Sequence, residues 1–316
     1  MYELHWGLPV ILYLFLGGLG AGAGAVSASV LLRNGATSDG PSADIARWGA
    51  LIAPLPVMIG TGMIIFELGS FQAGDWFKWI NLFTTINMSP MSIGSWVLSL
   101  FILVSLAYAY TYLERDMPAD DPRHGLRRAL AWLMAPLGIA VALYTGIMLG
   151  ATPARPFWNT PALAILFTIS ALSTGVASIL LIRALIGGGP EEAKEKPSTD
   201  AYWLTRSDTA LIGLEIVIVM LLLLSANMTF SHVESAFAII LGGDLTALFW
   251  IGFVAVGLVV PMLIELRYVI PTLLYQKAYT MPRATEILVC ALVLIGGFLL
   301  RYIVVIAGQM TGPGVL

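Results

Sequence analysis

Hydrophobic residues occur in eight long runs along the chain, and short segments rich in charged and polar residues separate these runs. Each run has at least about 20 mostly apolar residues, the length that an α-helix needs to cross the hydrocarbon core of a bilayer. The pattern therefore predicts an all-α integral membrane protein with eight transmembrane helices. The predicted spans are 9–32, 45–66, 91–113, 129–150, 162–186, 209–230, 245–270 and 284–308.

Three segments between the spans have recognisable patterns. The polar stretch 187–208, which begins GGGPEEAKEKPSTD, is typical of a flexible cytoplasmic connector. In 72–83, aromatic and polar residues alternate, which favours a short helix lying in the membrane interface with its tryptophans in the aromatic belt. AFAIILGG, residues 236–243, is too short to span and is predicted as a second interfacial segment.

The composition narrows the class of protein. Hydrophobic residues make up 58% of the 316 residues, charged residues only 11%, and the mean hydropathy is +0.87. Soluble domains carry about 25% charged residues, so this protein cannot cover its surface as a water-soluble one does. The net charge of -3 argues against nucleic acid as a partner, because nucleic-acid binding requires a basic patch.

The basic residues predict the orientation. Of the 16 Lys and Arg, 13 lie in or beside the loops after the first, third, fifth and seventh spans, against two, Lys78 and Arg155, on the opposite side. Because basic loops stay in the cytoplasm, both termini are predicted on the outer side. The loops 67–90, 151–161 and 231–244 then lie on that outer side as well.

Scarce cysteine and histidine limit the cofactors. The single cysteine, Cys290, cannot form an internal disulfide or hold an iron–sulfur cluster. His5, His124 and His232 all lie outside or at the edges of the spans, where they cannot supply the facing ligands of an intramembrane haem. We therefore expect no haem, metal or iron–sulfur cluster in this chain.

Polar or aromatic side chains from four spans are predicted at one depth near the outer face. Arg301 lies about 25 Å from the cytoplasmic start of the last span, close to that face. Side chains that converge from separate helices are typical of a ligand pocket. The six residues are His5, Trp6, Tyr13, Glu67, Tyr144 and Arg301.

Each of these residues also has a purely structural interpretation. Arg301 could snorkel or pair with Glu67, Tyr144 could be an ordinary interface tyrosine, and His5 could be solvated. Asn87, in the loop sequence NMSPM, either joins the pocket or satisfies loop backbone groups.

Two further acids and a glycine run have alternative interpretations. Glu215 lies about 9 Å inside the sixth span, where it is either a proton relay or a neutral, hydrogen-bonded acid. Glu265 and Arg267 are predicted to form a solvated pair at a helix end. The glycines of LGGLGAGAG, residues 16–24, predict a small-residue face for close helix packing, since no strand precedes them to make a dinucleotide-binding loop.

Five motifs together resemble the NrfD/PsrC family, the quinone-reactive membrane subunits of polysulfide, thiosulfate, nitrite and related reductases or dehydrogenases. The resemblance covers nearly the whole chain in order. The motifs are HWGLPVILYLFLGGLGAG (5–22), SPMSIGSW (89–96), LYTGIMLGATPARPFWNTP (143–161), VVPM (259–262) and LRYIVVIAGQ (300–309).

The resemblance implies a single membrane domain of two four-helix bundles, 1–150 and 162–308, in a bacterial or archaeal cytoplasmic membrane with periplasmic termini. It also implies a quinone pocket in the outer half of the first bundle. Tyr144 matches the family's quinone-site tyrosine, and Glu67 matches an acid that ends the second helix. The polysulfide reductase subunit has an Asn-x-x-His pair in its first helix, a stretch that here runs from Pro9 to Leu12.

Further residues fall in the outer motifs of the family. Arg155, Trp158 and Asn159 match the outer loop that caps the site and faces a partner subunit. Arg301 and Gln309 fall in the motif of the last helix. The implied partners are a ferredoxin-like iron–sulfur subunit on the outer face, with a molybdopterin or multihaem catalytic subunit.

These implications favour a quinone/quinol oxidoreductase subunit, with menaquinone or ubiquinone as substrate. Tyr144 or His5 would donate to a quinone oxygen, Glu67 and Glu215 would relay protons, and Arg301 would stabilise negative charge. Trp6, Tyr13, Asn87, Arg155 and Trp158 would line the quinone site. The alternatives are a secondary transporter, for which Pro54, Pro56 and Pro136 could break helices, and a passive anchor without a working site.

Overall fold

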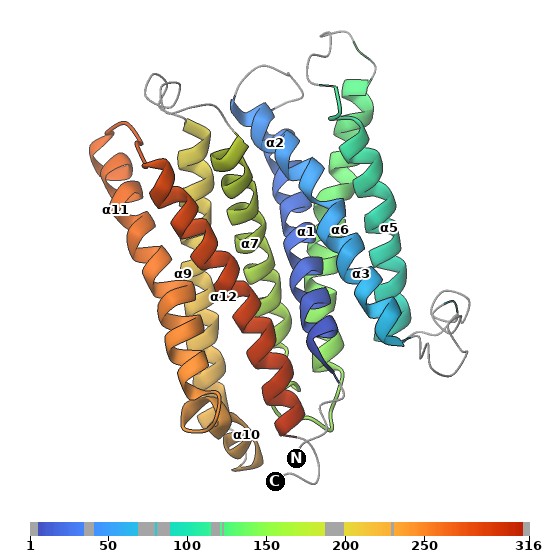
Figure 1. Ribbon diagram of the computed structural model, residues 1–316, viewed down its shortest axis with the longest axis vertical. Helices are drawn as coiled ribbons and strands as arrows, with labels where there is room; N and C mark the ends of the chain where they lie inside the picture. Colours follow the sequence, from blue (N-terminus) through green and yellow to red (C-terminus); the bar gives the residue numbers. More distant parts are fainter. Residues whose placement is uncertain are drawn as a thin grey trace.

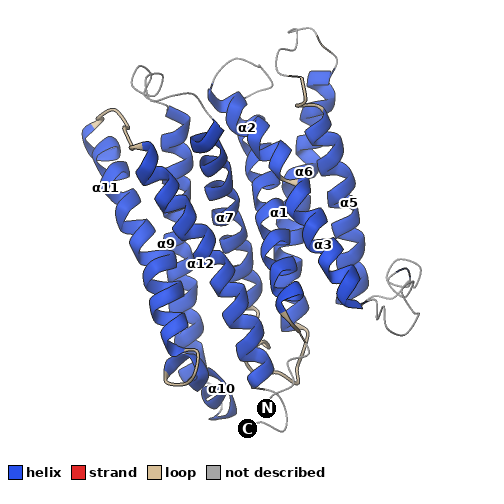
Figure 2. Ribbon diagram, in the orientation of Figure 1, coloured by secondary structure: helices blue, strands red, loops and turns tan. Residues whose placement is uncertain are grey.

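The computed structural model describes residues 6–34, 41–68, 80, 89–114, 121, 123–186, 199–228 and 231–311. Within these residues the regular structure is helical, with no strands (Figure 2). Eight helical spans in the described part of the chain are long and apolar enough to cross a membrane. The helices are α1 (Leu8–Asn34), α2 (Pro41–Ile52), α3 (Pro54–Leu68), α5 (Pro90–Tyr110), α6 (Arg123–Gly150), α7 (Ala162–Ile186), α9 (Thr199–Asn227), α10 (Ser231–Leu241), η3 (Leu248–Val259), α11 (Val260–Tyr275) and α12 (Arg283–Met310).

All eight predicted spans are confirmed as helices of membrane-spanning length. Two of them consist of two parts. The second span is α2 followed by α3, and the break falls at Ala53 because Pro54 has no N–H to continue the helical hydrogen bonds. The seventh is the π-helical η3 continued by α11. Pro136, by contrast, lies inside the continuous helix α6.

The sixth span begins earlier than predicted. Helix α9 starts at Thr199, within the stretch that was expected to be a connector up to residue 208. The hydroxyl and carboxyl groups of Thr205 and Asp208 are buried against other helices, so the polar residues here lie in a helix and not in a solvated linker. The predicted interfacial helix at 72–83 lies outside the described residues except for Ile80, whereas the segment 236–243 lies in the short helix α10 and the turn after it.

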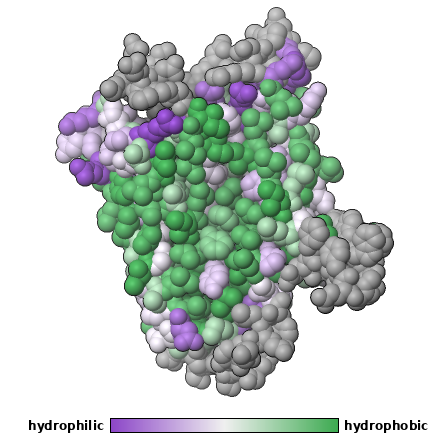
Figure 3. Space-filling view, in the orientation of Figure 1, coloured by the Kyte–Doolittle hydropathy of each residue, from purple (hydrophilic) through white to green (hydrophobic). Residues whose placement is uncertain are grey.

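Both termini lie at the same end of the molecule (Figure 1). We call this the terminal end; α6 ends and α7 begins there. At the opposite end, here called the basic end, α1, α5, α7 and α11 finish and the next helix starts. The hydrophobic residues on the face shown in Figure 3 cover the middle of the molecule, and hydrophilic residues gather towards its two ends.

Helix α1 is the centre of the bundle. It contacts α2, α3, α6, α7 and α12. Its crossing with α7 is closest at Gly22, where an added Cβ would strike the backbone of Ala171, and Gly175 of α7 in turn lies on the backbone of Gly22. This contact confirms the predicted small-residue face, because only glycine lets the two backbones approach so closely.

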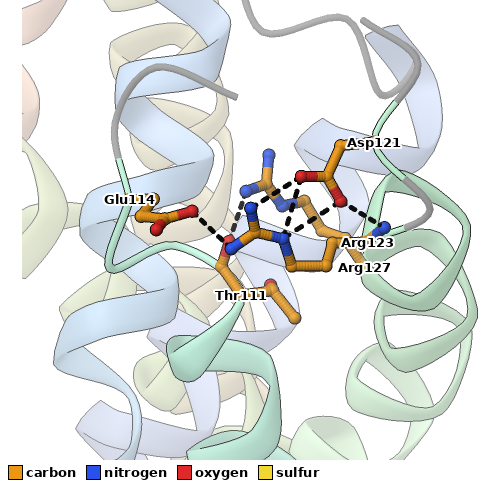
Figure 4. A network of polar contacts seen from close by, with 5 residues as sticks. All are labelled: Thr111, Glu114, Asp121, Arg123 and Arg127. Atoms are coloured by element: carbon orange, nitrogen blue, oxygen red, sulfur yellow. Dashed lines mark hydrogen bonds and ion pairs between the residues drawn. The ribbon is translucent and has the colours of Figure 1, made fainter. Parts of the chain in front are cut away.

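A polar network joins α5 to α6 at the basic end (Figure 4). The guanidinium of the buried Arg127 donates to the carbonyl oxygen of Thr111, just past the end of α5, and lies 4.0 Å from the ring centroid of Tyr112. Arg123 forms ion pairs with Glu114 and Asp121. Hydrogen bonds from the Arg123 side chain and backbone lower the pKa of Asp121 to about 2.

Candidate functional site

A pair of tyrosines lies near the terminal end of the bundle. Tyr13 is buried in the second turn of α1, and the partly buried Tyr144 comes from α6, about 9 Å before that helix ends. Their side chains lie close enough to interact with each other. The Tyr144 hydroxyl also donates to Sδ of Met148, at 3.4 Å. Two residues that the sequence placed at one depth therefore meet.

Neighbouring helices fix both rings through glycine contacts. The ring of Tyr144 lies directly on Gly94 of α5, where an added Cβ would overlap its Cε2 and Cζ atoms. Gly60 of α3 lies beside the backbone of Tyr13, 3.2 Å from its Cα when a Cβ is built. The start of α5 is fixed by Ser89, whose Oγ accepts a hydrogen bond from the Ser92 N–H at 3.3 Å. Residues of the SPMSIGSW motif thus position Tyr144.

Open space lies beside one residue of α1 on the helix face that carries Tyr13. Gly17 is buried, yet no atom outside its own helix lies within 4 Å of the position where a Cβ would stand. It follows Tyr13 by four residues on α1, so both residues lie on the same helix face. An open space on the helix face that carries Tyr13 can receive a flat, largely hydrophobic molecule with polar oxygens.

The predicted outer residues Trp6, Arg155 and Trp158 form a cluster that fastens the terminal end. Trp6 and Trp158 stack with ring centroids 5.1 Å apart. Trp158 Nε1 donates to the Val304 carbonyl at 2.7 Å, and the Arg155 guanidinium donates to the Gly308 and Gln309 carbonyls of α12. Arginine is suited to this position because it can satisfy the unpaired carbonyls at a helix C-terminus.

The loop 151–161, which carries Arg155 and Trp158, has both buried and exposed residues. Phe157 is buried against Phe237 of α10, with ring centroids 4.6 Å apart, and Trp158 is buried as described. Between and around these anchors, Ala151, Pro153 and Asn159 are exposed. The loop 151–161 is therefore held in place by its buried aromatic residues, while its exposed residues remain accessible at the surface.

Arg301 lies deeper in the bundle, 1% exposed. Its guanidinium donates to Ser170 Oγ at 2.5 Å and to the Gly297 and Phe167 carbonyls at 2.9 and 3.2 Å. It interacts electrostatically with Glu215. Nine residues of α12 follow Arg301, and its hydrogen bonds go to α7 and to its own helix and not to the tyrosine pair.

Glu215 lies nearer the middle of the bundle than predicted, because α9 begins ten residues earlier. It is 2% exposed and interacts with Ser170 and Arg301. The residues of the predicted site therefore form two groups: Tyr13 and Tyr144 between α1 and α6, and Arg301 and Glu215 between α7, α9 and α12.

The prediction for Glu265 was wrong. Instead of forming a solvated pair with Arg267, it is 1% exposed and accepts a hydrogen bond from Thr209 Oγ1 at 2.8 Å. It also interacts with Asp208, another acid that is 1% exposed. Ser173 Oγ donates to Asp208 Oδ1 at 2.6 Å. The reason for the difference is that α11 continues for ten residues beyond Glu265, which keeps this carboxyl inside the bundle.

Asp208 is a residue that the sequence reasoning missed. The predicted span began one residue after it, so it was counted with the connector. Its spacing of seven residues from Glu215 was the available signal, since that spacing places two residues on one helix face. Three predicted residues lie outside what the structure describes: His5 and Asn87 altogether, and Glu67, which is in α3 but whose side chain is not described.

The chain is similar to known reductase subunits. The family model described as polysulphide reductase, NrfD, matches residues 1–313. The chain is 28% identical to protein NrfD of Escherichia coli (strain K12) over 98% of its own length and 96% of that protein. It is 29% identical to a chain of the polysulfide reductase of Wolinella succinogenes over 96% and 94%. It is 22% identical to a subunit of the selenate reductase of Mesobacillus selenatarsenatis over 82% and 66%.

Proposed function

The chain belongs to the NrfD polysulphide reductase family, and from that premise we propose that it is the quinone-reactive membrane subunit of a multi-subunit oxidoreductase. Relatives of this chain are named as parts of polysulfide and selenate reductases. The observation that carries the proposal is the Tyr13–Tyr144 pair, with the open space at Gly17 on the same face of α1 as Tyr13.

The chemistry of a quinone matches these residues. Reduction of a quinone to a quinol takes up two electrons and two protons, and oxidation of the quinol releases the same. A phenol hydroxyl can donate to a quinone oxygen and pass on a proton, which is the role we assign to Tyr144 and Tyr13. The surrounding apolar helices exclude water and hold the head group against this pair. We propose that the stacked rings of Trp6 and Trp158 lie on the terminal side of the head group.

We propose that the electrons are exchanged with an iron–sulfur subunit at the terminal end. A single cysteine, Cys290, cannot hold a cluster, so the clusters belong to a partner. The loop 151–161 suits a docking surface, because buried Phe157 and Trp158 hold it in place while other residues of the loop are exposed. The excess of basic residues at the opposite end supports a cytoplasmic position for that end and a periplasmic position for the termini.

We assign the tyrosine pair to the first of two proposed four-helix halves, residues 1–150, and the Arg301 group to residues 162–308. Glu67 is the last residue but one of α3, at the end of that helix on the terminal side. We propose that it relays protons there, as its match to the family's acid suggests.

Removal of the phenol oxygens tests the proposal. We expect Tyr144→Phe and Tyr13→Phe, each in the assembled complex, to lower quinone-linked electron transfer by about 100-fold or more, the usual contribution of a positioned proton donor. Tyr110→Phe is the matched control, since this tyrosine of α5 is 68% exposed. The partner subunits' activity with an artificial dye should be unchanged in all three variants.

Other results would favour the alternatives. Full quinone-linked activity in both tyrosine variants would overturn the assignment of the site. Assembly of the unaltered chain with its partner but no binding of a quinone analogue would indicate a passive anchor. Movement of a solute into vesicles by the protein alone would indicate a transporter.

A further inference from the structure

Two arginines from different helices lie against one tryptophan ring at the basic end. Arg33 is in the last turn of α1, and Trp203 and Arg206 are near the start of α9. The Cζ atoms of Arg33 and Arg206 lie 4.8 and 5.0 Å from the centroid of the Trp203 ring. Because α1 and α9 each pack on α7 (Figure 1), the cluster joins the ends of two helices that have α7 as a common neighbour.

The positive charge of this cluster is not balanced by an ion pair within the described part of the chain. The ion pairs found there belong to Arg123, which contacts Glu114 and Asp121. The face of an indole ring attracts a guanidinium through its quadrupole but carries no net charge. Two guanidinium groups on one ring also repel each other, since they carry like charges at short distance. The cluster of Arg33 and Arg206 is therefore suited to an anion that contacts both arginines.

An anion can reach the cluster from the surface. The Arg33 side chain is exposed, Arg206 is partly exposed, and Trp203 is 39% exposed. A guanidinium matches phosphate well, because its planar set of N–H donors can make two parallel hydrogen bonds to phosphate oxygens. The shared ring restricts both side chains before binding, which lowers the entropy that is lost when a phosphate group binds. These features favour a phosphate group as the anion.

The surface next to the cluster is apolar along α9. Its outward-facing apolar residues follow Trp203 at steps of three, four or seven positions, which places them on one face of the helix. The largest of them are 46 to 56% exposed. These residues are Ala210, Leu214, Val217, Leu221 and Leu224. A phosphate group attached to hydrocarbon chains would use both the cluster and this apolar face, whereas a free phosphate would use only the cluster.

We propose that Arg33, Trp203 and Arg206 bind the head-group phosphate of an anionic phospholipid in the leaflet at the basic end. An acyl chain of this lipid lies along the outward face of α9. Tryptophan is enriched at the level of the lipid head groups, and basic groups between helices recruit anionic lipids. The inference does not depend on the quinone function. The bound phosphate links α1, in the first proposed half of the chain, to α9 in the second.

Native mass spectrometry of the delipidated, full-length protein tests the selectivity. Phosphatidylglycerol and phosphatidylcholine with identical acyl chains are titrated separately. We expect one phosphatidylglycerol molecule to bind about tenfold or more tightly than phosphatidylcholine, because the choline group brings a positive charge towards the arginines. Equal affinities for the two lipids would overturn the proposal.

Variants then identify the residues. Arg33→Gln and Arg206→Gln should each weaken the binding of phosphatidylglycerol by about tenfold, the usual effect of losing a hydrogen bond to a charged group. Lysine at either position keeps the charge but loses the paired donors, so we expect intermediate affinities. Arg128→Gln is the matched control, because Arg128 is exposed near the start of α6 at the same end. If the double glutamine variant binds phosphatidylglycerol as tightly as Arg128→Gln does, the cluster is not the site.

Photolabelling locates the lipid in the unaltered protein and needs no variant. A phosphatidylglycerol with a photoreactive group in one acyl chain should label peptides of α9 that contain residues 210–224. Excess unlabelled phosphatidylglycerol should suppress this labelling, and phosphatidylcholine should do so about tenfold less effectively. Labelling confined to other helices would overturn the proposal. This result decides if the double variant does not fold.

A thermal measurement separates a lipid from free phosphate. A ligand that binds only the folded protein raises its thermal midpoint. Phosphatidylglycerol in detergent should therefore raise the midpoint of the unaltered protein and of Arg128→Gln, but not that of the double glutamine variant. Inorganic phosphate at the same concentration should leave the midpoint unchanged. An equal rise with inorganic phosphate would overturn the assignment of the cluster to a lipid.

Discussion

The side-chain amide of Gln309 makes two hydrogen bonds to the backbone of Trp6, accepting from its N–H at 2.8 Å and donating to its carbonyl at 3.0 Å. The last turn of α12 is thereby joined to the residues that lead into α1. The Nε2 atom also lies 3.3 Å from the Val305 carbonyl. A helix end within a membrane protein leaves carbonyl groups unpaired, and here Gln309 and Arg155 together fasten this end to its neighbours.

Gln309→Ala should destabilise the protein by about 1–3 kcal/mol, because it leaves partly buried backbone groups of Trp6 without partners. The measurement is the midpoint of thermal unfolding in detergent. Ser207→Ala is the control, since that exposed hydroxyl bonds only within its own helix; it should change the free energy of unfolding by less than about 0.5 kcal/mol. Equal midpoints for the two variants would show that the Trp6 contact contributes nothing.

The contact between Gly94 and Tyr144 allows a second prediction. Gly94→Ala places a methyl group where the Tyr144 ring lies, so the ring must turn and carry its hydroxyl away from Tyr13. We expect quinone-linked electron transfer to fall by about tenfold or more, with a stability cost of about 1–3 kcal/mol, the usual range for overpacking. Quinone titration of the assembled complex measures the rate.

Gly125→Ala serves as the control for this variant, because nothing lies within 4 Å of a Cβ at Gly125. It should leave quinone-linked transfer unchanged. If Gly94→Ala transfers electrons as fast as Gly125→Ala, the position of the Tyr144 ring does not matter for the reaction.

The sequence was sufficient for those features that depend on depth alone. Apolar length located all eight spans, and counting residues along the helices brought Tyr13 and Tyr144 to one level. It was not sufficient for features that depend on how helices turn towards one another. Arg301 donates a hydrogen bond to Ser170 because α7 and α12 turn these two residues towards each other. The sequence of α12 does not indicate which of its faces meets α7.

Glu265 is a second residue whose surroundings could not be predicted from the sequence. A carboxyl near a predicted helix end is usually solvated, and the sequence offered Arg267 as its partner. Its burial follows from the length of α11 and from the hydroxyl group of Thr209, which α9 places opposite it. This contact joins residues that are 56 positions apart.

The crossing of α1 and α7 supplies a third prediction. Gly22→Ala would push a methyl group into the backbone of Ala171, which is less free to move aside than a side-chain tip. We expect the two helices to separate locally and the free energy of unfolding to fall by about 1–3 kcal/mol or more. Gly62→Ala, on α3, is the matched change at a position with open space. Thermal midpoints of the purified variants check this, and a midpoint for Gly22→Ala as high as that for Gly62→Ala would contradict the close crossing.

Asp121 supplies a prediction about pH. Hydrogen bonds from the Arg123 side chain and backbone lower the pKa of this carboxyl from 3.8 to about 2 in the folded protein. A group whose pKa is lower in the folded state stabilises the fold at all pH values above its unfolded pKa, and this contribution disappears as the pH falls through the folded pKa. The stabilisation by Asp121 should therefore be constant from pH 8 to about 5 and vanish at about pH 2. Comparison of thermal midpoints for the unaltered protein and Asp121→Asn across this range measures it; a difference that changes between pH 8 and 6 would show that another group, and not Asp121, controls the pH dependence at the basic end.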